Sequence, residues 1–175
     1  MSDIEGSAIR ESGVRVRAAG DEDVGFMFAL APRLAEVADL SWHEPRDLIA
    51  FQHRYMRAAF ARPKSETVTL IAETSSGERL GYVHAEAATD SVTLEPCGYV
   101  TVLALIKEAE GQGVADRLMR DVEDWARAQG FRLLGLDVFA NNQRARAFYR
   151  RLGYEEDSLR LTKPLAKPLT PGKAS

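Results

Sequence analysis

A pair of glycines near the middle of the chain lies between an apolar run and an amphipathic one. The stretch reads Gly-Gln-Gly-Val-Ala at residues 111–115. Where a strand turns directly into a helix, the free backbone N–H groups and the positive end of the helix dipole bind an anion. Glycine suits such a turn because it adopts positive φ and lets a phosphate approach the backbone. The stretch therefore predicts a phosphate-binding turn, with an ordinary tight turn as the alternative.

Two common nucleotide-binding motifs do not match the spacing. A P-loop requires Gly, four residues and then Gly-Lys-Ser/Thr, and the sequence contains no such stretch. A dinucleotide fingerprint requires Gly-x-Gly-x-x-Gly/Ala, but its last position is Asp116, and residues 107–110 separate the first glycine from the preceding strand. ATP binding at this turn is therefore only a lesser alternative.

Two segments together resemble the signatures of the GNAT N-acetyltransferase family. Glu-Gly-Gln-Gly-Val-Ala at residues 110–115 is similar to that family's acetyl-coenzyme A motif, Gln/Arg-x-x-Gly-x-Gly/Ala. Asn-Gln-Arg-Ala-Arg-Ala-Phe-Tyr at residues 142–149, followed by Leu-Gly-Tyr at 152–154, resembles the family's second motif, Asn-x-x-Ala-x-x-x-Tyr with Leu-Gly-Phe/Tyr. The two motifs occur in the family's order and separation, and matching element types extend from Val14 to Leu165.

The resemblance implies that acetyl-CoA is the co-substrate. In the family the glycine turn holds the diphosphate, and the pantetheine arm lies along a central strand that is splayed open. A backbone N–H near Leu105 would then donate to the acyl oxygen. Carried over residue by residue, the resemblance places these residues at the cofactor: Leu103, Ala104, Leu105, Gly111, Gln112, Gly113, Val114, Ala115 and Asn142.

One position departs from the family motif. Glu110 stands where the family has Gln or Arg, and Glu108 is close to it. Carboxylates beside a diphosphate weaken its binding unless they face solvent or pair with a cation such as Lys107. The departure supports one alternative function, a non-catalytic acyl-CoA-binding or regulatory module of the same fold.

The resemblance assigns catalytic roles to Tyr149 and Asp137. Tyr149 matches the family's common proton donor, although a phenol of pKa about 10 protonates a thiolate of pKa about 8.5 only when it is well positioned. The alternative for Tyr149 is core packing, because it shares an apolar helix face with Leu152. Asp137 interrupts a predicted apolar strand at the position where ribosomal-protein N-terminal acetyltransferases of this family place a Glu that serves as the general base. Alternatively, Asp137 caps the end of a strand or pairs with an arginine. In that case a chain of water molecules could act as the base.

The histidines and the cysteine form no recognisable site. His43, His53 and His84 lack metal-ligand spacing, and Cys97 is alone, so we expect no metal and no internal disulfide. His43 lies in a loop between the first two predicted helices, which wall the acceptor pocket in the family. That loop is therefore a candidate for substrate contacts.

The composition limits the class of protein and of partner. With 175 residues, 45% hydrophobic and 28% charged, the chain suits one globular domain. A net charge of -3 gives no general attraction to nucleic acid. No apolar run approaches the roughly 20 residues of a spanning helix, and the N-terminus lacks the pattern of a secretory signal. We therefore expect a cytoplasmic protein with no nucleic-acid or membrane partner.

The hydrophobic pattern predicts a mixed α/β fold. The resemblance implies the GNAT fold, with a mixed central sheet of about six to seven strands flanked by about four helices. Pro32 is expected to kink or split the first helix, and Pro45 to begin the second. The predicted strands cover residues 14–17, 67–73, 80–87, 99–106, 133–139 and a last strand or pair around 158–162. The predicted helices begin near residues 21, 45, 114 and 143.

These elements position the predicted site within one domain. We expect a flexible N-terminal segment at 1–13, a GNAT acetyltransferase domain at 14–165 and a flexible C-terminal tail at 166–175. The expected activity is direct acetyl transfer from acetyl-CoA to a primary amine in a ternary complex, the amine being a peptide N-terminus, a lysine or a small amine. Uncovered edge strands are compatible with a homodimer.

Overall fold

The computed structural model describes residues 13–37, 42–62 and 64–165. Both predicted flexible ends lie outside these ranges, apart from Gly13. Part of the candidate loop before His43, residues 38–41, also lies outside them. Within the described part of the chain, none of the helices combines the length and the apolar composition of a membrane-crossing segment.

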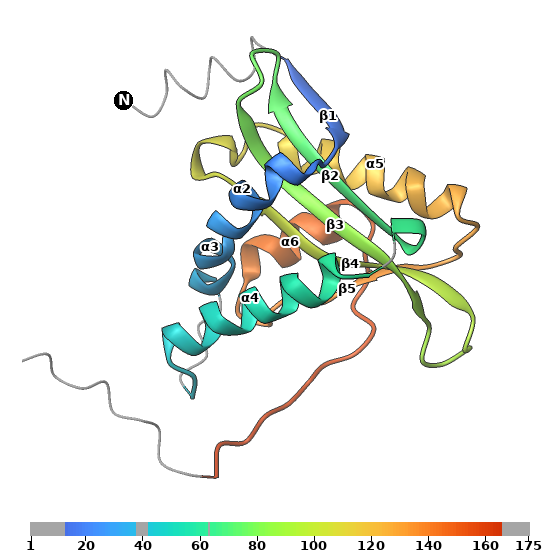
Figure 1. Ribbon diagram of the computed structural model, residues 1–175. Coiled ribbons are helices and arrows are strands. Elements are labelled where there is room, and N and C mark those ends of the chain that lie inside the picture. Colours follow the sequence, from blue (N-terminus) through green and yellow to red (C-terminus); the bar gives the residue numbers. More distant parts are fainter. Residues whose placement is uncertain (1–12, 38–41, 63, 166–175) are drawn as a thin grey trace, which may run out of the picture.

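A single mixed sheet forms the centre of the fold (Figure 1). Its strands follow the chain order from β1 to β5, with antiparallel pairing up to β4 and parallel pairing of β5 with β4. The mixed α/β prediction is confirmed, with five strands instead of six to seven. The strands are β1 (Val14–Ala18), β2 (Thr67–Thr74), β3 (Arg79–Thr89), β4 (Pro96–Leu105) and β5 (Leu134–Leu136).

The strand predicted around residues 158–162 is wrong. Leu159 and Leu161 alternate as in a strand, but they are 70% and 84% exposed and the segment has no regular structure. A strand needs a neighbour for its backbone groups, and Figure 1 shows this segment running away from the sheet. The alternating apolar pattern is therefore present, but no strand of the described sheet pairs with this segment.

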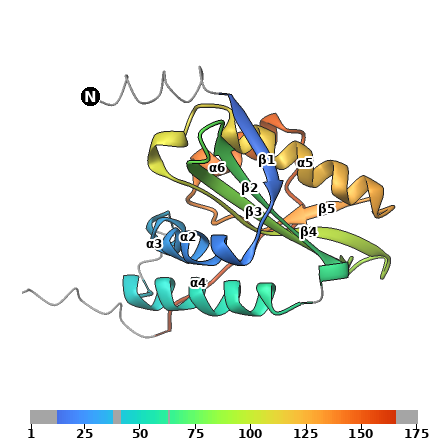
Figure 2. The ribbon, with the colours of Figure 1, turned by 45° about the horizontal axis from the view of Figure 1, so that its top comes forward.

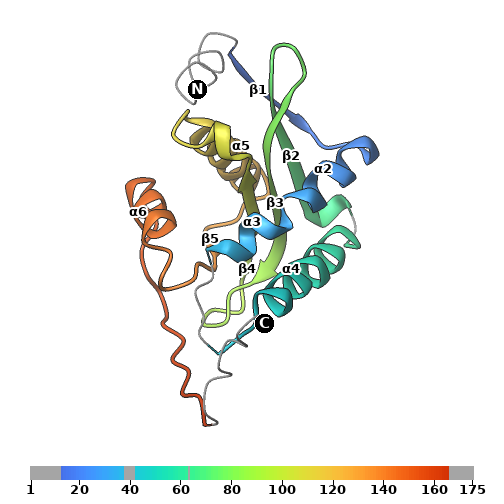
Figure 3. The same ribbon diagram turned by 90° about the vertical axis from the view of Figure 1, so that its left-hand side faces the viewer.

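The helices cover both faces of the sheet. Helices α2 (Val24–Ala29), α3 (Ala31–Glu36) and α4 (Pro45–Phe60) lie on one face, and α5 (Val114–Ala128) and α6 (Gln143–Arg151) lie on the other (Figure 2 and Figure 3). The predicted split at Pro32 is confirmed, because α2 ends at Ala29 and α3 carries Pro32 in its first turn. Pro45 begins α4, as predicted.

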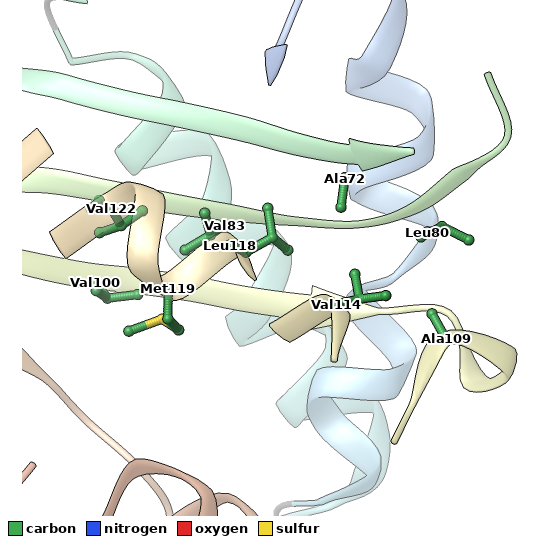
Figure 4. Packing of buried hydrophobic residues seen from close by; sticks show 10 residues of the cluster. Ala72, Leu80, Val83, Val100, Ala109, Val114, Leu118, Met119 and Val122 are labelled. Atoms are coloured by element: carbon green, nitrogen blue, oxygen red, sulfur yellow. The ribbon is translucent and has the colours of Figure 1, made fainter. Parts of the chain in front are cut away.

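Apolar side chains pack between the sheet and α5 (Figure 4). Leu118 and Val122 of α5 are fully buried, as is Val83 of β3. A second cluster, which includes Met56 and Tyr82, fills the space between the sheet and the helices α2 to α4. The sheet is therefore covered on both faces, as the two-sided apolar pattern of β4 predicted.

Strand β4 contains a bulge at Thr101. In the register with β3, His84 lies opposite Val102 and Ala85 lies opposite Val100, which leaves Thr101 as an extra residue. The Thr101 hydroxyl donates to the His84 carbonyl at 3.1 Å. A bulge changes which face of the sheet the following residues point to, so it re-aims the second half of β4.

Strands β4 and β5 separate directly before the bulge. Their pairing covers only Gly98 to Val100 against Leu134 to Leu136, whereas β4 continues to Leu105. Residues 101–105 therefore lack a strand neighbour on the β5 side. We call this part of the sheet the β4–β5 opening.

Candidate active site

The β4–β5 opening presents backbone groups of Leu103 and Leu105. The N–H of Ile106 donates to the carbonyl of Leu80 at 2.9 Å, so Ile106 and Ala104 direct their backbone groups toward β3. In an antiparallel ladder alternate residues point to opposite sides, and Leu103 and Leu105 therefore point toward the opening. This is the place where the resemblance predicted a splayed strand.

Ala104 lies differently from its two neighbours. Its side chain is only 5% exposed and belongs to the cluster under α2 to α4. Its backbone groups face Tyr82 of β3. Ala104 therefore holds β4 in place, and the groups directed into the opening come from the residues on either side of it.

The glycine turn connects the opening to helix α5. Beyond β4 the chain forms a short 3-10 helix, η3 (Lys107–Ala109), and then the turn. Gly111 has φ of +74° and Gly113 has φ of +79°, so both adopt the left-handed conformation that favours glycine. A Cβ at either position would meet no atom within 4 Å. Glycine is therefore required by the backbone conformation, and the space beside the turn is open.

The first turn of α5 has no side-chain cap. Gly113 occupies the N-cap position and has no side chain that could accept from the first N–H groups of the helix. Val114 is fully buried and Ala115 is partly buried, so the groups that they could offer to a ligand are their backbone N–H groups. Uncapped N–H groups and the helix dipole together suit an anion.

Glu110 is held by two arginines from different helices. Arg33 of α3 places Nη2 2.5 Å from Glu110 Oε1, and Arg144 of α6 pairs with Oε2. Arg33 also donates from Nε to the carbonyl of Leu105 at 2.9 Å. Of the two alternatives for this carboxylate, facing solvent or pairing with a cation, the structure shows the pairing, and the cations are these arginines instead of Lys107. Neither of these two pairings was predicted from the sequence.

Asn142 begins helix α6. Its Oδ1 accepts from the N–H of Ala145 at 3.1 Å, which makes Asn142 the N-cap residue. The side-chain oxygen is thereby used within the helix, whereas the side-chain NH2 can still donate to a ligand. The Asn of the second motif therefore has a structural role as a helix cap, and its contact with the cofactor stays a prediction.

Tyr149 lies on the inner face of α6 among other aromatic rings. Its ring centroid is 5.1 Å from that of Phe148 and 5.7 Å from that of Tyr154, both in edge-to-face geometry. Burial raises the pKa of Tyr149 to about 12. The phenol is therefore protonated at every physiological pH, which a proton donor requires, and its packing fits the alternative role as well.

Asp137 follows β5 directly and its side chain is exposed. The predicted apolar strand over residues 133–139 has only three residues, so Asp137 does not interrupt a strand. The reason is the departure of β4 after Val100, which leaves β5 without a partner beyond Leu136. Burial, followed by the nearby Asp137 carboxylate and Tyr55, raises the pKa of Tyr99 of β4 well above its usual value. Tyr99 is a further residue that the sequence analysis did not single out.

The histidines lie apart from one another. His84 is buried in the sheet, where Thr69 Oγ1 lies 2.7 Å from its Nδ1, and burial lowers its pKa to about 4. His53 packs against Phe28, with 5.8 Å between ring centroids. Among the described residues, no three His, Cys, Asp or Glu side chains gather in a group that could hold a metal ion.

Two known N-acetyltransferases are similar to parts of the chain in sequence. The chain is 32% identical over 93 residues to "Uncharacterized N-acetyltransferase YhfO" of Bacillus subtilis, which covers 53% of this chain and 62% of that protein. It is 37% identical over 57 residues to "N-alpha-acetyltransferase 30" of Schizosaccharomyces pombe, which covers 33% of this chain and 38% of that protein. The chain therefore spans less than two thirds of the length of these relatives.

Solved structures share the fold at low sequence identity. A putative acetyl transferase from Pyrococcus furiosus matches with a TM-score of 0.74 and 21% identity, over 87% of this chain and 100% of that one. The aminoglycoside N-acetyltransferase AAC(6')-Iy in complex with CoA matches with a TM-score of 0.63 and 18% identity, over 89% of this chain and 97% of that one. The family model described as "Acetyltransferase (GNAT) family" matches residues 33–154. The chain belongs to the GNAT acetyltransferase family.

Proposed function

We propose that the chain transfers an acetyl group from acetyl-CoA to a primary amine, which is a peptide N-terminus, a lysine side chain or a small amine. The observation that carries the proposal is the adjacency of the β4–β5 opening and the uncapped start of α5. The opening suits an extended chain that contains amides, and the helix start suits phosphates. Membership in the family supports acetyl-CoA as the donor.

In this proposal the backbone holds most of the cofactor. The N–H groups of Gly113, Val114 and Ala115 receive the diphosphate, and Gly111 and Gln112 shape the turn that exposes them. These contacts are independent of side-chain identity. Glu110, at the first position of the motif, is therefore compatible with binding of the diphosphate.

The pantetheine arm would lie along the opening. Leu103 and Leu105 offer N–H and C=O groups to its amides, while Ala104 keeps the strand in register. The side-chain NH2 of Asn142 can donate from the start of α6. Arg33 donates to the carbonyl of Leu105, so that carbonyl offers its second lone pair to a ligand.

The reaction needs a neutral amine, a polarised carbonyl and a proton for the thiolate. Asp137, directly or through water, takes a proton from the ammonium ion. The amine nitrogen then bonds to the acetyl carbon, and a backbone N–H near Leu105 stabilises the oxyanion. The C–S bond breaks, and Tyr149 protonates the sulfur and is reprotonated with the second proton from nitrogen. One proton per turnover reaches solvent.

Direct transfer is favoured over a covalent acyl-enzyme. Cys97 is the single cysteine of the chain and lies near the start of β4. Burial raises the pKa of its thiol, which opposes formation of the thiolate that a nucleophile requires. We therefore assign Cys97 no chemical role.

The resemblance around Asp137 and Tyr149 to ribosomal-protein N-terminal acetyltransferases slightly favours a peptide amine among the three kinds of acceptor. Similarity to an N-alpha-acetyltransferase of Schizosaccharomyces pombe, although limited to 57 residues, points in the same direction.

The test is thiol release from acetyl-CoA in the presence of a tetrapeptide with a free N-terminus, Nα-acetyl-lysine amide and 2-phenylethylamine. We expect turnover with at least one of them, and a loss of about 100-fold or more in kcat for Tyr149→Phe. Tyr82→Phe is the matched control, because it also removes one buried phenol oxygen, whose contact is the Met56 sulfur at 3.7 Å.

A second readout separates the enzyme from the alternative, a non-catalytic acyl-CoA-binding module. Binding of CoA is measured by calorimetry on the same samples. CoA binding without turnover on any of the amines would favour the module. Absence of both would remove the cofactor assignment.

A further inference from the structure

The last residue of β4 presents two backbone groups of opposite polarity to the β4–β5 opening. In an extended strand the N–H and the carbonyl of one residue lie on the same edge, and Leu105 directs both away from β3. The N–H suits an acyl oxygen that becomes an oxyanion, whereas the partial negative charge of the carbonyl beside it opposes that oxyanion. An oxyanion at this end of β4 is therefore favoured by a positive group on the Leu105 carbonyl.

Arg33 of α3 supplies a positive group at this carbonyl. Its Nε donates to the Leu105 oxygen at 2.9 Å, so the guanidinium lies close to the N–H of the same residue. The Arg33 side chain is only 28% exposed, and water therefore screens its charge incompletely. The end of β4 thus carries a backbone donor with a cation next to it.

The position of Leu105 relative to this cation is fixed from the β3 side. The N–H of Ile106 donates to the carbonyl of Leu80 at 2.9 Å, which holds the peptide group that follows Leu105. A Cβ on Gly81 would lie 2.3 Å from Leu105 Cδ2, so the leucine side chain lies directly over the glycine. Leu105 therefore cannot turn away from Arg33 without breaking the sheet.

Glu110 holds the guanidinium from the other side. Nη2 of Arg33 lies 2.5 Å from Glu110 Oε1, so the planar guanidinium bridges the Leu105 carbonyl and this carboxylate. Arg144 of α6, on the opposite face of the sheet, pairs with the second oxygen of Glu110 (Figure 3). Two guanidinium groups against one carboxylate leave one positive charge among these three side chains. Glu110 therefore anchors Arg33 without cancelling its charge.

We propose that Arg33 is a positioning residue for acetyl transfer, which counteracts the dipole of the Leu105 carbonyl and so makes the end of β4 favourable to an oxyanion. This inference rests on the proposed function. Arg33 gives and takes no proton, and the bonds that form and break stay as described above. The proposal also gives a role to the acid that departs from the family motif, because Glu110 holds a cation at β4.

The first test measures polarisation of the thioester without turnover. Infrared difference spectra of acetyl-CoA with ¹²C and ¹³C at the acetyl carbonyl give the C=O stretch of the bound thioester. We expect a lower frequency in the wild type than in solution, since a positive environment draws electrons toward the carbonyl oxygen. Arg33→Gln should lose at least half of this shift. Arg33→Lys should retain most of it, because an ammonium group with three donors keeps the charge.

The second test compares two arginine variants that remove the same charge from Glu110. Among the hydrogen bonds of the described residues, Leu105 shares one with Arg33 and none with Arg144. We expect Arg33→Gln and Arg144→Gln to lose CoA affinity alike, by about 3- to 5-fold. The kcat of Arg33→Gln should be about 10-fold below that of Arg144→Gln. Arg33→Lys should keep kcat within about 3-fold of the wild type.

The outcomes separate this inference from the proposed function. A frequency shift that Arg33→Gln abolishes and Arg33→Lys retains supports the role of Arg33 even if no amine is acetylated. An equal shift in wild type and Arg33→Gln, or equal kcat values for Arg33→Gln and Arg144→Gln, overturns that role while acetyl transfer stands. Equal losses in Arg33→Gln and Arg33→Lys overturn it too, since charge then has no part. Absence of acetyl-CoA binding to the wild type in calorimetry removes the proposed function, and the role of Arg33 with it.

Discussion

Arg33 and Leu105 are joined by a hydrogen bond of 2.9 Å from the guanidinium Nε to the carbonyl oxygen. The same guanidinium pairs with Glu110 at 2.5 Å. One side chain of α3 therefore connects the β4–β5 opening with the beginning of the glycine turn. Arg144 of α6 completes the arrangement on the second oxygen of Glu110. The acid that departs from the family motif is thus surrounded by a net positive charge.

Arg144→Gln is expected to weaken CoA binding by about 3- to 5-fold at low salt. The substitution removes a cation beside the predicted diphosphate site and leaves the Glu110 carboxylate less compensated. Both effects oppose an anionic ligand. Because the pair is partly exposed, the difference should shrink above about 0.5 M salt. Calorimetric titration with CoA at two salt concentrations measures it.

Two further variants test this explanation. Arg150→Gln removes the same charge from the same helix, but Arg150 pairs with Glu156, so CoA affinity should be nearly unchanged. The double variant Arg144→Gln/Glu110→Gln should regain most of the lost affinity. Equal effects of the two arginine substitutions would show that only net charge matters.

Gly113→Ala is expected to weaken CoA binding strongly and to destabilise the fold by about 1 kcal/mol, because alanine must adopt φ of +79°. The space around Gly113 is open, so steric crowding adds nothing to this loss of stability. Gly25 is the matched control, since it lies inside α2 with nothing near its absent Cβ. Gly25→Ala should leave CoA affinity unchanged and raise stability by up to about 1 kcal/mol. Thermal melts and CoA titrations of the two variants give the comparison.

Local patterns predicted the glycine turn and both motif helices correctly. Positive φ at Gly111 and Gly113 and the capping of α6 by Asn142 depend on neighbours within a few residues. Such features can be recognised in the sequence, because residue type and spacing determine them directly. The split of the first helix at Pro32 belongs to the same class.

The features that the sequence did not reveal depend on residues far apart in the chain. Thr101 is extra only relative to the register of β3, which residues near Thr101 do not determine. Strand β5 is short because β4 leaves it after Val100, and this is why Asp137 lies at a strand end and not inside a strand. The ion pair of Arg33 with Glu110 joins positions 77 residues apart. No local spacing indicates such a contact.

The raised pKa of Tyr149 gives a prediction for the pH profile of kcat. Burial stabilises the neutral phenol, which raises its pKa to about 12, so the proton donor should not be lost below about pH 11. We expect kcat to stay level from about pH 8 to about pH 10. A stopped assay of acetylated product, run with the best acceptor, measures the profile. A decline of kcat centred near pH 10 would contradict this, since it would indicate a phenol in an ordinary aqueous environment.

Asp23 is the most strongly paired acid in the described part of the chain. Its side chain is fully buried, and Arg17 and Arg79 lie 2.7 Å and 2.6 Å from its two oxygens. The N–H of Gly20 also donates to it, at 2.8 Å. The Arg17 hydrogen bond, followed by burial acting in the opposite sense and then the Gly20 and Arg79 bonds, holds the pKa of Asp23 well below its usual value. This cluster connects β1, the segment before α2, and β3.

Asp23→Asn should lower the free energy of unfolding at pH 7 by about 3 kcal/mol, because two arginines lose a buried partner. A depressed folded-state pKa contributes stability that is present above the unfolded pKa of about 4 and declines as the pH falls below it. The difference between wild type and variant should therefore be constant from pH 7 to 5 and shrink toward pH 3. Urea unfolding at these pH values measures it, with Asp124→Asn as control, since Asp124 pairs with Arg127 on the exposed face of α5. A difference that stays constant down to pH 3 would mean that Asp23 acts through packing and not through its charge.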